Sequence, residues 1–185
     1  AIPLGDPAGI GPEVVLKAIS NPTLYSTAHV TLIGDTRCLE KTLEHINGTP
    51  DKLAIDLHQV PLIEADHPIP GLPDIAVGHP SKVTGQASFS WLNRAITGAL
   101  AGEFDAVVTA PIAKSVWHEA GHIYPGQTEV LAERAQVEKF GMMFAARSPH
   151  TRWQLRCLLA TTHIPLNQVP AALTPAVMTH KLSLL

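Results

Sequence analysis

Apolar residues along the chain follow two patterns in alternation, one typical of strands and one typical of helices. Short apolar runs of strand length lie at 2–4 and 30–33, and apolar residues three or four positions apart mark helices at 13–20 and 84–102. Further strands are predicted at 106–110, 142–146 and 155–160, a weakly alternating strand at 53–60, and further helices at 37–46, 112–120, 130–137 and 174–185. Because strands alternate with helices, the order predicts a three-layer α/β fold with a largely parallel sheet.

The connection at 61–83 is predicted to be rich in loops because it contains Pro61, Pro68, Pro70, Pro73 and Pro80. Ligands of parallel sheets bind beyond the carboxyl ends of the strands. Polar residues that directly follow a predicted strand are therefore the first candidates for a functional site.

The first strand end is rich in glycine, proline and acidic residues; it reads Gly5-Asp6-Pro7-Ala8-Gly9-Ile10-Gly11-Pro12-Glu13. Glycine permits positive φ, Pro12 suits the first turn of a helix, and an acid such as Glu13 is favoured there by the helix dipole. The pattern predicts a tight turn before a helix whose N-terminus faces a cleft and holds an anionic or polar ligand. A compact strand-to-helix connection explains the same residues. The spacing matches neither the dinucleotide fingerprint nor a P-loop.

Two other strand ends carry polar residues, Thr109-Ala110-Pro111-Ile112-Ala113-Lys114 and Thr161-Thr162-His163. Asp6 and Lys114 are weak catalytic candidates on their strand-end positions alone. A neutral imidazole at His163 can bind a metal or a substrate oxygen, although a structural histidine is the commoner case. His118 and His122 stand four residues apart, but Gly121 interrupts the predicted helix, so the pair is discounted as a metal site.

The segment Gly126-Gln127-Thr128-Glu129 precedes a predicted helix. Thr128 is a candidate N-cap, and Gln127 would then lie beside the free N–H groups, where a phosphate or carboxylate binds well. Capping alone also explains the segment and is the simpler interpretation of its spacing.

Composition narrows the class of protein. Hydrophobic residues make up 45% and charged residues 16% of the 185 residues, and the net charge is −3 without a basic cluster, which argues against nucleic-acid binding. No apolar run approaches the roughly 18 residues of a membrane span. Two distant cysteines, Cys38 and Cys157, favour a reducing, cytoplasmic compartment. The apolar pattern of the last predicted helix has not ended at Leu185, so we expect that the chain is part of a longer protein.

The four motifs, at 5–13, 109–114, 126–129 and 161–163 along the chain, together resemble the 4-hydroxythreonine-4-phosphate dehydrogenase family of vitamin B6 biosynthesis (pyridoxine and pyridoxal phosphate). The resemblance covers essentially the whole chain. It implies a fold like those of isocitrate and isopropylmalate dehydrogenases, with two α/β domains around a cleft and a homodimer that shares its active site. It also implies that residues 1–185 are the N-terminal portion of such an enzyme and that the second half is absent from this chain.

The resemblance also implies a chemistry. Family members oxidise a secondary alcohol of a small-molecule substrate with NAD or NADP, and the product then loses CO₂. A divalent metal (Zn, Mg or Co) held by three histidines grips the substrate, and His163 matches one of them; the other two belong to the second half, one of them in the partner subunit. Thr128 matches a substrate-binding threonine. Gln127 stands where the family has histidine, and glutamine can form hydrogen bonds but cannot become cationic.

Two alternatives stay open. The missing positive charge at Gln127 suits a dehydrogenase of an unphosphorylated substrate, such as a cis-dihydrodiol carboxylate or a sugar acid. The other alternative is an inactive truncated fragment that acts only as a folding or dimerising unit.

Overall fold

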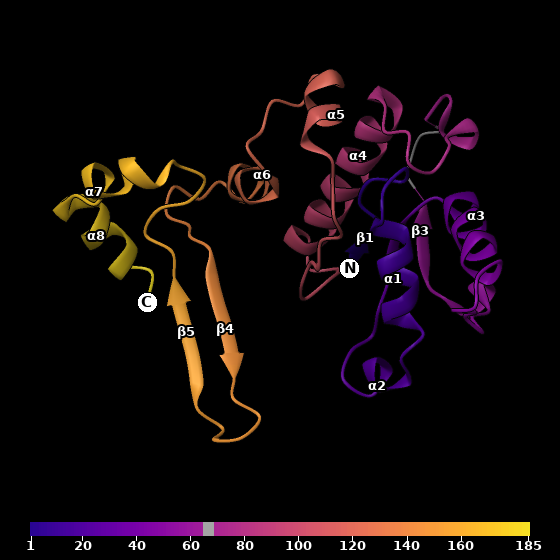
Figure 1. The fold of residues 1–185 in the computed structure, drawn as a ribbon, viewed down its shortest axis with the longest axis horizontal. Coiled ribbons are helices and arrows are strands. Elements are labelled where there is room, and N and C mark those ends of the chain that lie inside the picture. Colours follow the sequence, from indigo (N-terminus) through magenta and orange to yellow (C-terminus); the bar gives the residue numbers. More distant parts are fainter. Residues whose placement is uncertain (65–68) are drawn as a thin grey trace. The chain divides into compact units, whose positions relative to one another are not determined.

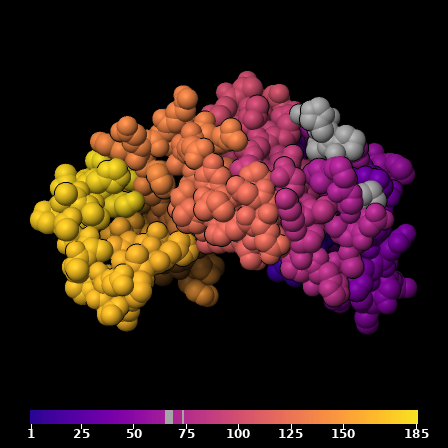
Figure 2. Space-filling view, turned by 90° about the horizontal axis from the view of Figure 1, so that it is seen from above, coloured from indigo at the N-terminus to yellow at the C-terminus, as the bar shows by residue number. Residues whose placement is uncertain are grey.

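A computed structural model describes residues 1–64 and 69–185 and divides them into two compact units, 1–127 and 128–185. In Figure 1 and Figure 2 the first unit runs from indigo to salmon and the second from orange to yellow. Pro68, which belongs to the predicted loop-rich connection, lies outside the described residues. In the described part of the chain, no helix is both long and apolar enough to cross a membrane.

A parallel sheet organises the first unit. Its strands β1 (Ile2–Pro3), β2 (Leu32–Gly34) and β3 (Leu62–Glu64) lie in this order, with Ile2 opposite Leu32 and Leu32 opposite Leu62. This confirms an α/β fold with a parallel sheet.

Helices pack around this sheet. The helices α1 (Gly11–Ile19) and α3 (Thr36–Asn47) pack on each other, and the long helix α4 (Lys82–Leu100) packs on β1, β2 and α5 (Lys114–Glu119). The core between them is aliphatic with one large aromatic side chain; it includes Leu4, Leu16, Leu32, Ile33, Leu39 and Trp91. Shorter elements complete the unit: α2 (Pro22–Tyr25) and the 3₁₀ helices η1 (Leu57–Gln59) and η2 (Leu72–Asp74).

The strand predicted at 53–60 is wrong, and the real strand lies just after it. Residues Leu57–Gln59 form η1, whose first turn is capped by Asp56 Oδ1 accepting from the His58 N–H at 3.1 Å. The strand is β3, inside the connection that the prolines marked as loop. Pro61 does not prevent this, because its carbonyl accepts the Leu32 N–H at 2.8 Å, and proline lacks only the donor.

The strand predicted at 106–110 is also absent, although the segment lies beside β1. The Val108 N–H donates to the Ala1 carbonyl at 2.9 Å, and the Asp6 N–H donates to the Pro111 carbonyl at 2.9 Å. In a parallel ladder residue 3 would next donate to the Val108 carbonyl, but Pro3 has no N–H. The ladder is broken there, and Val108 is 60% exposed rather than buried.

The second unit contains an antiparallel hairpin, not further parallel strands. The strands β4 (Met143–Arg147) and β5 (Gln154–Leu158) pair with Met143 opposite Leu158, and both are largely exposed. Strands were predicted at 142–146 and 155–160, but as part of a largely parallel sheet. Six residues connect them, whereas a parallel crossover needs about a dozen or more. The remaining elements are α6 (Gln127–Arg134), which begins at the end of the first unit, η3 (Leu166–Gln168), α7 (Val169–Ala172) and α8 (Pro175–Leu182).

Candidate functional site

The glycine turn after β1 lies against the segment that ends at Pro111. Gly5 adopts φ +72°, and a Cβ there would collide with the Pro111 carbonyl oxygen. The Asp6 N–H donates to that same oxygen at 2.9 Å. Two of the predicted strand ends, far apart in the sequence, therefore meet at one edge of the first unit, and only glycine fits the contact.

Asp6 is buried and closes the turn. Its Oδ1 accepts from the Ala8 N–H at 2.9 Å, and its carbonyl accepts from the Gly9 N–H at 3.0 Å. This is an Asx turn, which leads into α1. The contacts favour the compact-connection interpretation of the motif and give Asp6 a structural role in shaping this edge.

Gln127 reaches the same edge. Its Nε2 donates to the Ala110 carbonyl at 3.2 Å, so the third motif joins the first two within the first unit. Lys114, the first residue of α5, follows the same segment and is exposed to solvent. A neutral donor therefore contacts the segment that ends at Pro111, and a cation follows that segment in the chain.

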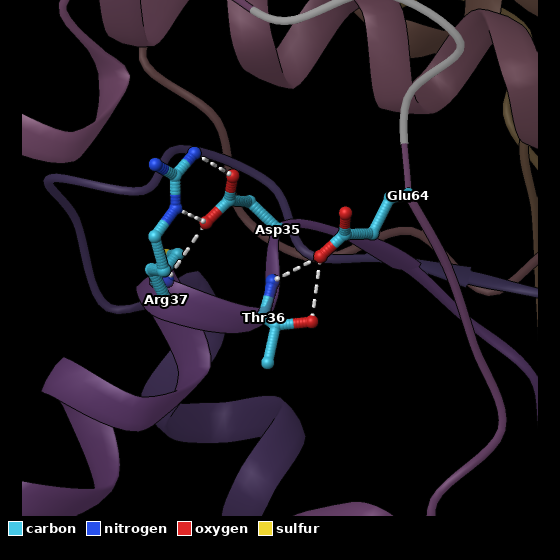
Figure 3. Close-up of polar contacts among 5 residues, drawn as sticks. Asp35, Thr36, Arg37 and Glu64 are labelled. Carbon is cyan, nitrogen blue, oxygen red and sulfur yellow. Dashed lines mark hydrogen bonds and ion pairs between the residues drawn. The ribbon is translucent and has the colours of Figure 1, made fainter.

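A polar network that the sequence did not reveal lies beyond β2 and β3 (Figure 3). The Thr36 N–H and Oγ1 donate to Glu64 Oε1 at 3.2 and 2.6 Å, and Arg37 pairs with Asp35 at 2.8 Å. Asp35 also caps α3 by accepting from the Cys38 N–H at 3.2 Å. The cap could be predicted from the sequence, because an acid stands directly after a predicted strand and before a predicted helix. The role of Glu64 could not be predicted, because the segment that forms β3 was expected to be loop.

In the second unit, Thr128 and Thr162 line one small pocket of about 40 Å³. Lys181 lines it as well and donates from Nζ to the Phe140 carbonyl at 3.1 Å. The structure thus brings the threonine of the Gln127–Thr128 pair together with the Thr-Thr-His motif. Because α6 begins at Gln127, Thr128 lies within the helix, and its prediction as N-cap is wrong.

His163 is exposed, with φ +56°, and follows β5 after four residues. An exposed imidazole is free to bind a ligand. However, no three His, Cys, Asp or Glu side chains come together within residues 1–64 and 69–185 to hold a metal ion. These residues do not form a metal site by themselves, and His163 can supply only one ligand.

Residues 118–122 spell H-E-x-x-H, the pattern of helical zinc sites. The helix ends at Glu119, so the two histidines do not share a helical face. His118 Nε2 lies 3.1 Å from the Tyr124 carbonyl oxygen, and His122 Nε2 lies 3.0 Å from Gln86 Oε1. Each of the two rings therefore has its own hydrogen-bond neighbour.

Comparison with known proteins places the chain in a family. The profile described as pyridoxal phosphate biosynthetic protein PdxA matches residues 26–185. The chain belongs to the PdxA family. A relative from Synechocystis sp., named 4-hydroxythreonine-4-phosphate dehydrogenase, is 57% identical over 98% of this chain and 52% of its own length. A relative of the same name from Synechococcus sp. is 50% identical over 95% of this chain and 51% of its own length.

A solved PdxA-family structure, 4-hydroxythreonine-4-phosphate dehydrogenase from Klebsiella pneumoniae, has a TM-score of 0.80 and 29% identity to this chain. The matched region is 98% of this chain and 55% of the Klebsiella pneumoniae chain. The family suggested by the four motifs is therefore confirmed. The chain spans about half the length of the curated PdxA relatives it matches.

Proposed function

We propose that this chain is the N-terminal portion of a two-domain dehydrogenase that oxidises 4-hydroxythreonine 4-phosphate, or a related hydroxy acid, with NAD or NADP and with decarboxylation. The observation that carries the proposal is the 57% identity to a relative of that name over 98% of the chain. The geometry supports it, because the motif residues gather at the Gly5–Pro111 edge in the first unit and at the Thr128–Thr162 pocket in the second.

Gln127 and Thr128 are the proposed substrate contacts. Gln127 already donates one carboxamide hydrogen to the Ala110 carbonyl, and its side-chain oxygen can only accept a hydrogen bond, so it binds hydroxyl or amine groups rather than neutralising an anion. Lys114 is the proposed cation for a negatively charged group. Asp6 acts on this edge indirectly, by holding the glycine turn in shape.

His163 is proposed as one ligand of a divalent metal, Zn, Mg or Co, whose other ligands come from polypeptide outside these 185 residues. When bound, such a metal supplies Lewis-acid stabilisation of the substrate alcohol. We further propose the isocitrate dehydrogenase-like arrangement and a homodimer with a shared site, located in the cytoplasm. The unpaired state of Cys38 and Cys157 fits a reducing compartment.

The test uses a chimera in which this chain is joined to the remaining half of the 57% identical Synechocystis relative. We expect NAD or NADP reduction with 4-hydroxythreonine 4-phosphate, and at least about 100-fold slower turnover in His163→Ala. His150→Ala, at another exposed histidine in the hairpin connection, is the control and should be nearly as active as the parent. Near-normal turnover of His163→Ala would reject the metal role.

The neutral side chain of Gln127 favours a second candidate, a dehydrogenase of an unphosphorylated dihydrodiol carboxylate or sugar acid. Under the first proposal, Gln127→His should raise kcat/KM for the phosphorylated substrate several-fold. Under the second, the parent chimera should prefer the unphosphorylated acid and Gln127→His should bring no gain.

The fragment alternative is tested on the 185-residue chain alone. A single histidine does not hold a divalent ion tightly, so we expect no micromolar metal binding and no turnover by the chain alone. A chimera that is inactive on every substrate, yet folded, would favour a folding or dimerising role.

A further inference from the structure

The β4–β5 hairpin has two chemically different faces. Side chains alternate across a strand, and directly paired residues share a face. One face, called here the apolar face, carries Phe144, Ala146, Trp153, Leu155 and Cys157, with the small polar Ser148 opposite Trp153. The other, the mixed face, carries Met143, Ala145, Arg147, Gln154, Arg156 and Leu158. Trp153 precedes β5 and extends the ladder, since its carbonyl accepts the Ser148 N–H at 2.8 Å.

The apolar face is open to solvent. Phe144 is 60%, Trp153 64% and Leu155 38% exposed, and Cys157 between them is exposed as well. Each square ångström of apolar surface left in water forgoes about 25 cal/mol. A sheet face that carries no charged side chain is normally one that packs against another layer, so the pattern indicates a partner layer.

Near the end of the chain, Leu184 approaches the mixed face. A Cβ built at Gly141, which alternates onto the mixed face, would lie 2.9 Å from Leu158 Cδ1 and 3.2 Å from Leu184 Cδ1. Leu184, just after α8, therefore approaches one end of the mixed face. In Figure 1 the turn of the hairpin points away from α7 and α8, which gather near the end of β5.

The size of the apolar face decides between occupants. Two strands of five residues present a footprint of about 17 by 10 Å, or about 170 Å². A stable dimer buries about 800 Å² on each partner, so this face alone cannot hold a second copy of the chain. A segment of the same polypeptide needs far less area, because it loses little translational freedom on packing.

We propose that the apolar face is the inner face of a sheet and that an amphipathic helix covers it. This helix belongs to the second half of the polypeptide, which the relatives have and this chain does not span. Helices cover sheet faces in α/β proteins. This helix presents apolar residues three and four positions apart to Phe144, Leu155 and Trp153. The proposal rests on the proposed N-terminal position of this chain in a longer enzyme, but not on the reaction or the substrate.

The two cysteines provide the test. Cys157 lies on the apolar face opposite Phe144, whereas Cys38 is buried, and burial raises the pKa of its thiol to about 12. A thiol reagent such as dithionitrobenzoate is added to the 185-residue chain and to the chimera with the second half of the Synechocystis relative. We expect Cys157 to react rapidly in the chain alone and at least ten times more slowly in the chimera, with Cys38 slow in both.

Several outcomes of these experiments would overturn the proposal. Protection of Cys157 that rises with the concentration of the 185-residue chain would identify a second copy as the occupant and overturn the proposal. A chimera that melts without cooperativity, or that leaves Cys157 fully reactive, would overturn it as well. Phe144→Ser should lower the Tm of the chimera more than Met143→Ser does, because these neighbours lie on opposite faces; equal losses would contradict the proposal.

Discussion

Two buried tryptophans differ in how their indole N–H is satisfied. Trp117 Nε1 donates to Ser88 Oγ at 2.8 Å, whereas Trp91 Nε1 has no partner among the residues that the structure describes. Phenylalanine at either position shrinks the ring and removes the donor. We expect Trp117→Phe to lower the free energy of unfolding by about 1 kcal/mol more than Trp91→Phe, because only the former breaks a buried hydrogen bond. Equal losses in urea denaturation would contradict this.

His122 makes stability depend on pH. Its ring stacks on Phe89 with centroids 3.6 Å apart, and burial lowers the pKa of the imidazole below its usual 6.5. The unfolded chain therefore binds the proton more readily, so the contribution of His122 is present above about pH 6.5 and is lost as the pH falls. His122→Phe keeps an aromatic ring but cannot titrate. When the pH is lowered from 7.5 to about 5, the parent should lose stability relative to His122→Phe, as measured by denaturant titrations. A stability difference that does not change with pH would contradict this.

At the scale of elements, the glycine turn after β1 depends on a close approach as well as on φ. Gly5 (φ +72°) lies against Pro111, whereas Gly102 (φ +79°) has nothing within 4 Å of a built Cβ. Gly102→Ala should cost only the left-handed penalty of about 1 kcal/mol, and Gly5→Ala should cost at least about 2 kcal/mol more. Thermal or urea unfolding measures both. Similar costs would show that the turn moves freely away from Pro111.

The broken ladder beside β1 makes a second prediction for an element. Pro3→Val restores the N–H that would donate to the Val108 carbonyl, so 106–110 should become a fourth parallel strand. NMR hydrogen exchange measures the result. The amides of residue 3 and Val108 in the variant should exchange with solvent at least ten times more slowly than the Val108 amide does in the parent. Unchanged exchange at Val108 would mean that Pro3 is not what ends the pairing.

At the scale of the whole molecule, the buried hydrophobic residues belong almost entirely to the first unit; within the described chain, only Val130 and Ala132 follow residue 127. Burial is what protects backbone hydrogen bonds from local opening. In the 185-residue chain we therefore expect the amides of β4 and β5 to exchange much faster than those of β2 and β3, although both sets are paired. Mass-spectrometric hydrogen exchange measures this, and equal protection would contradict it.

Much of the helical structure was predictable because its signals are local. Pro12 and Glu13 place the start of α1, and Thr174 with Pro175 places the start of α8, where Thr174 Oγ1 accepts the Val177 N–H at 3.2 Å. The strands were predicted less well. Whether 62–64 or 106–110 pairs depends on which carbonyls and N–H groups lie opposite, and an isolated segment does not contain that information.

The candidate site divides in the same way. The motif residues were identifiable in the chain order, since glycine, proline, threonine and histidine gather directly after the apolar runs, where a parallel sheet binds its ligands. Their contacts were not predictable: Gln127 bonds to Ala110, Thr128 shares a pocket with Thr162, and Glu64 joins Thr36, all between segments distant in sequence.

By itself the sequence determined the family, the α/β class and the longer helices, because hydrophobic period, capping residues and motif spelling act over a few neighbouring positions. Only the tertiary structure decided that 106–110 stays outside the sheet, that β4 and β5 form an antiparallel hairpin, and that this hairpin carries an exposed apolar face. Strand pairing and burial are properties of two segments at once, so they exist only after the chain has folded.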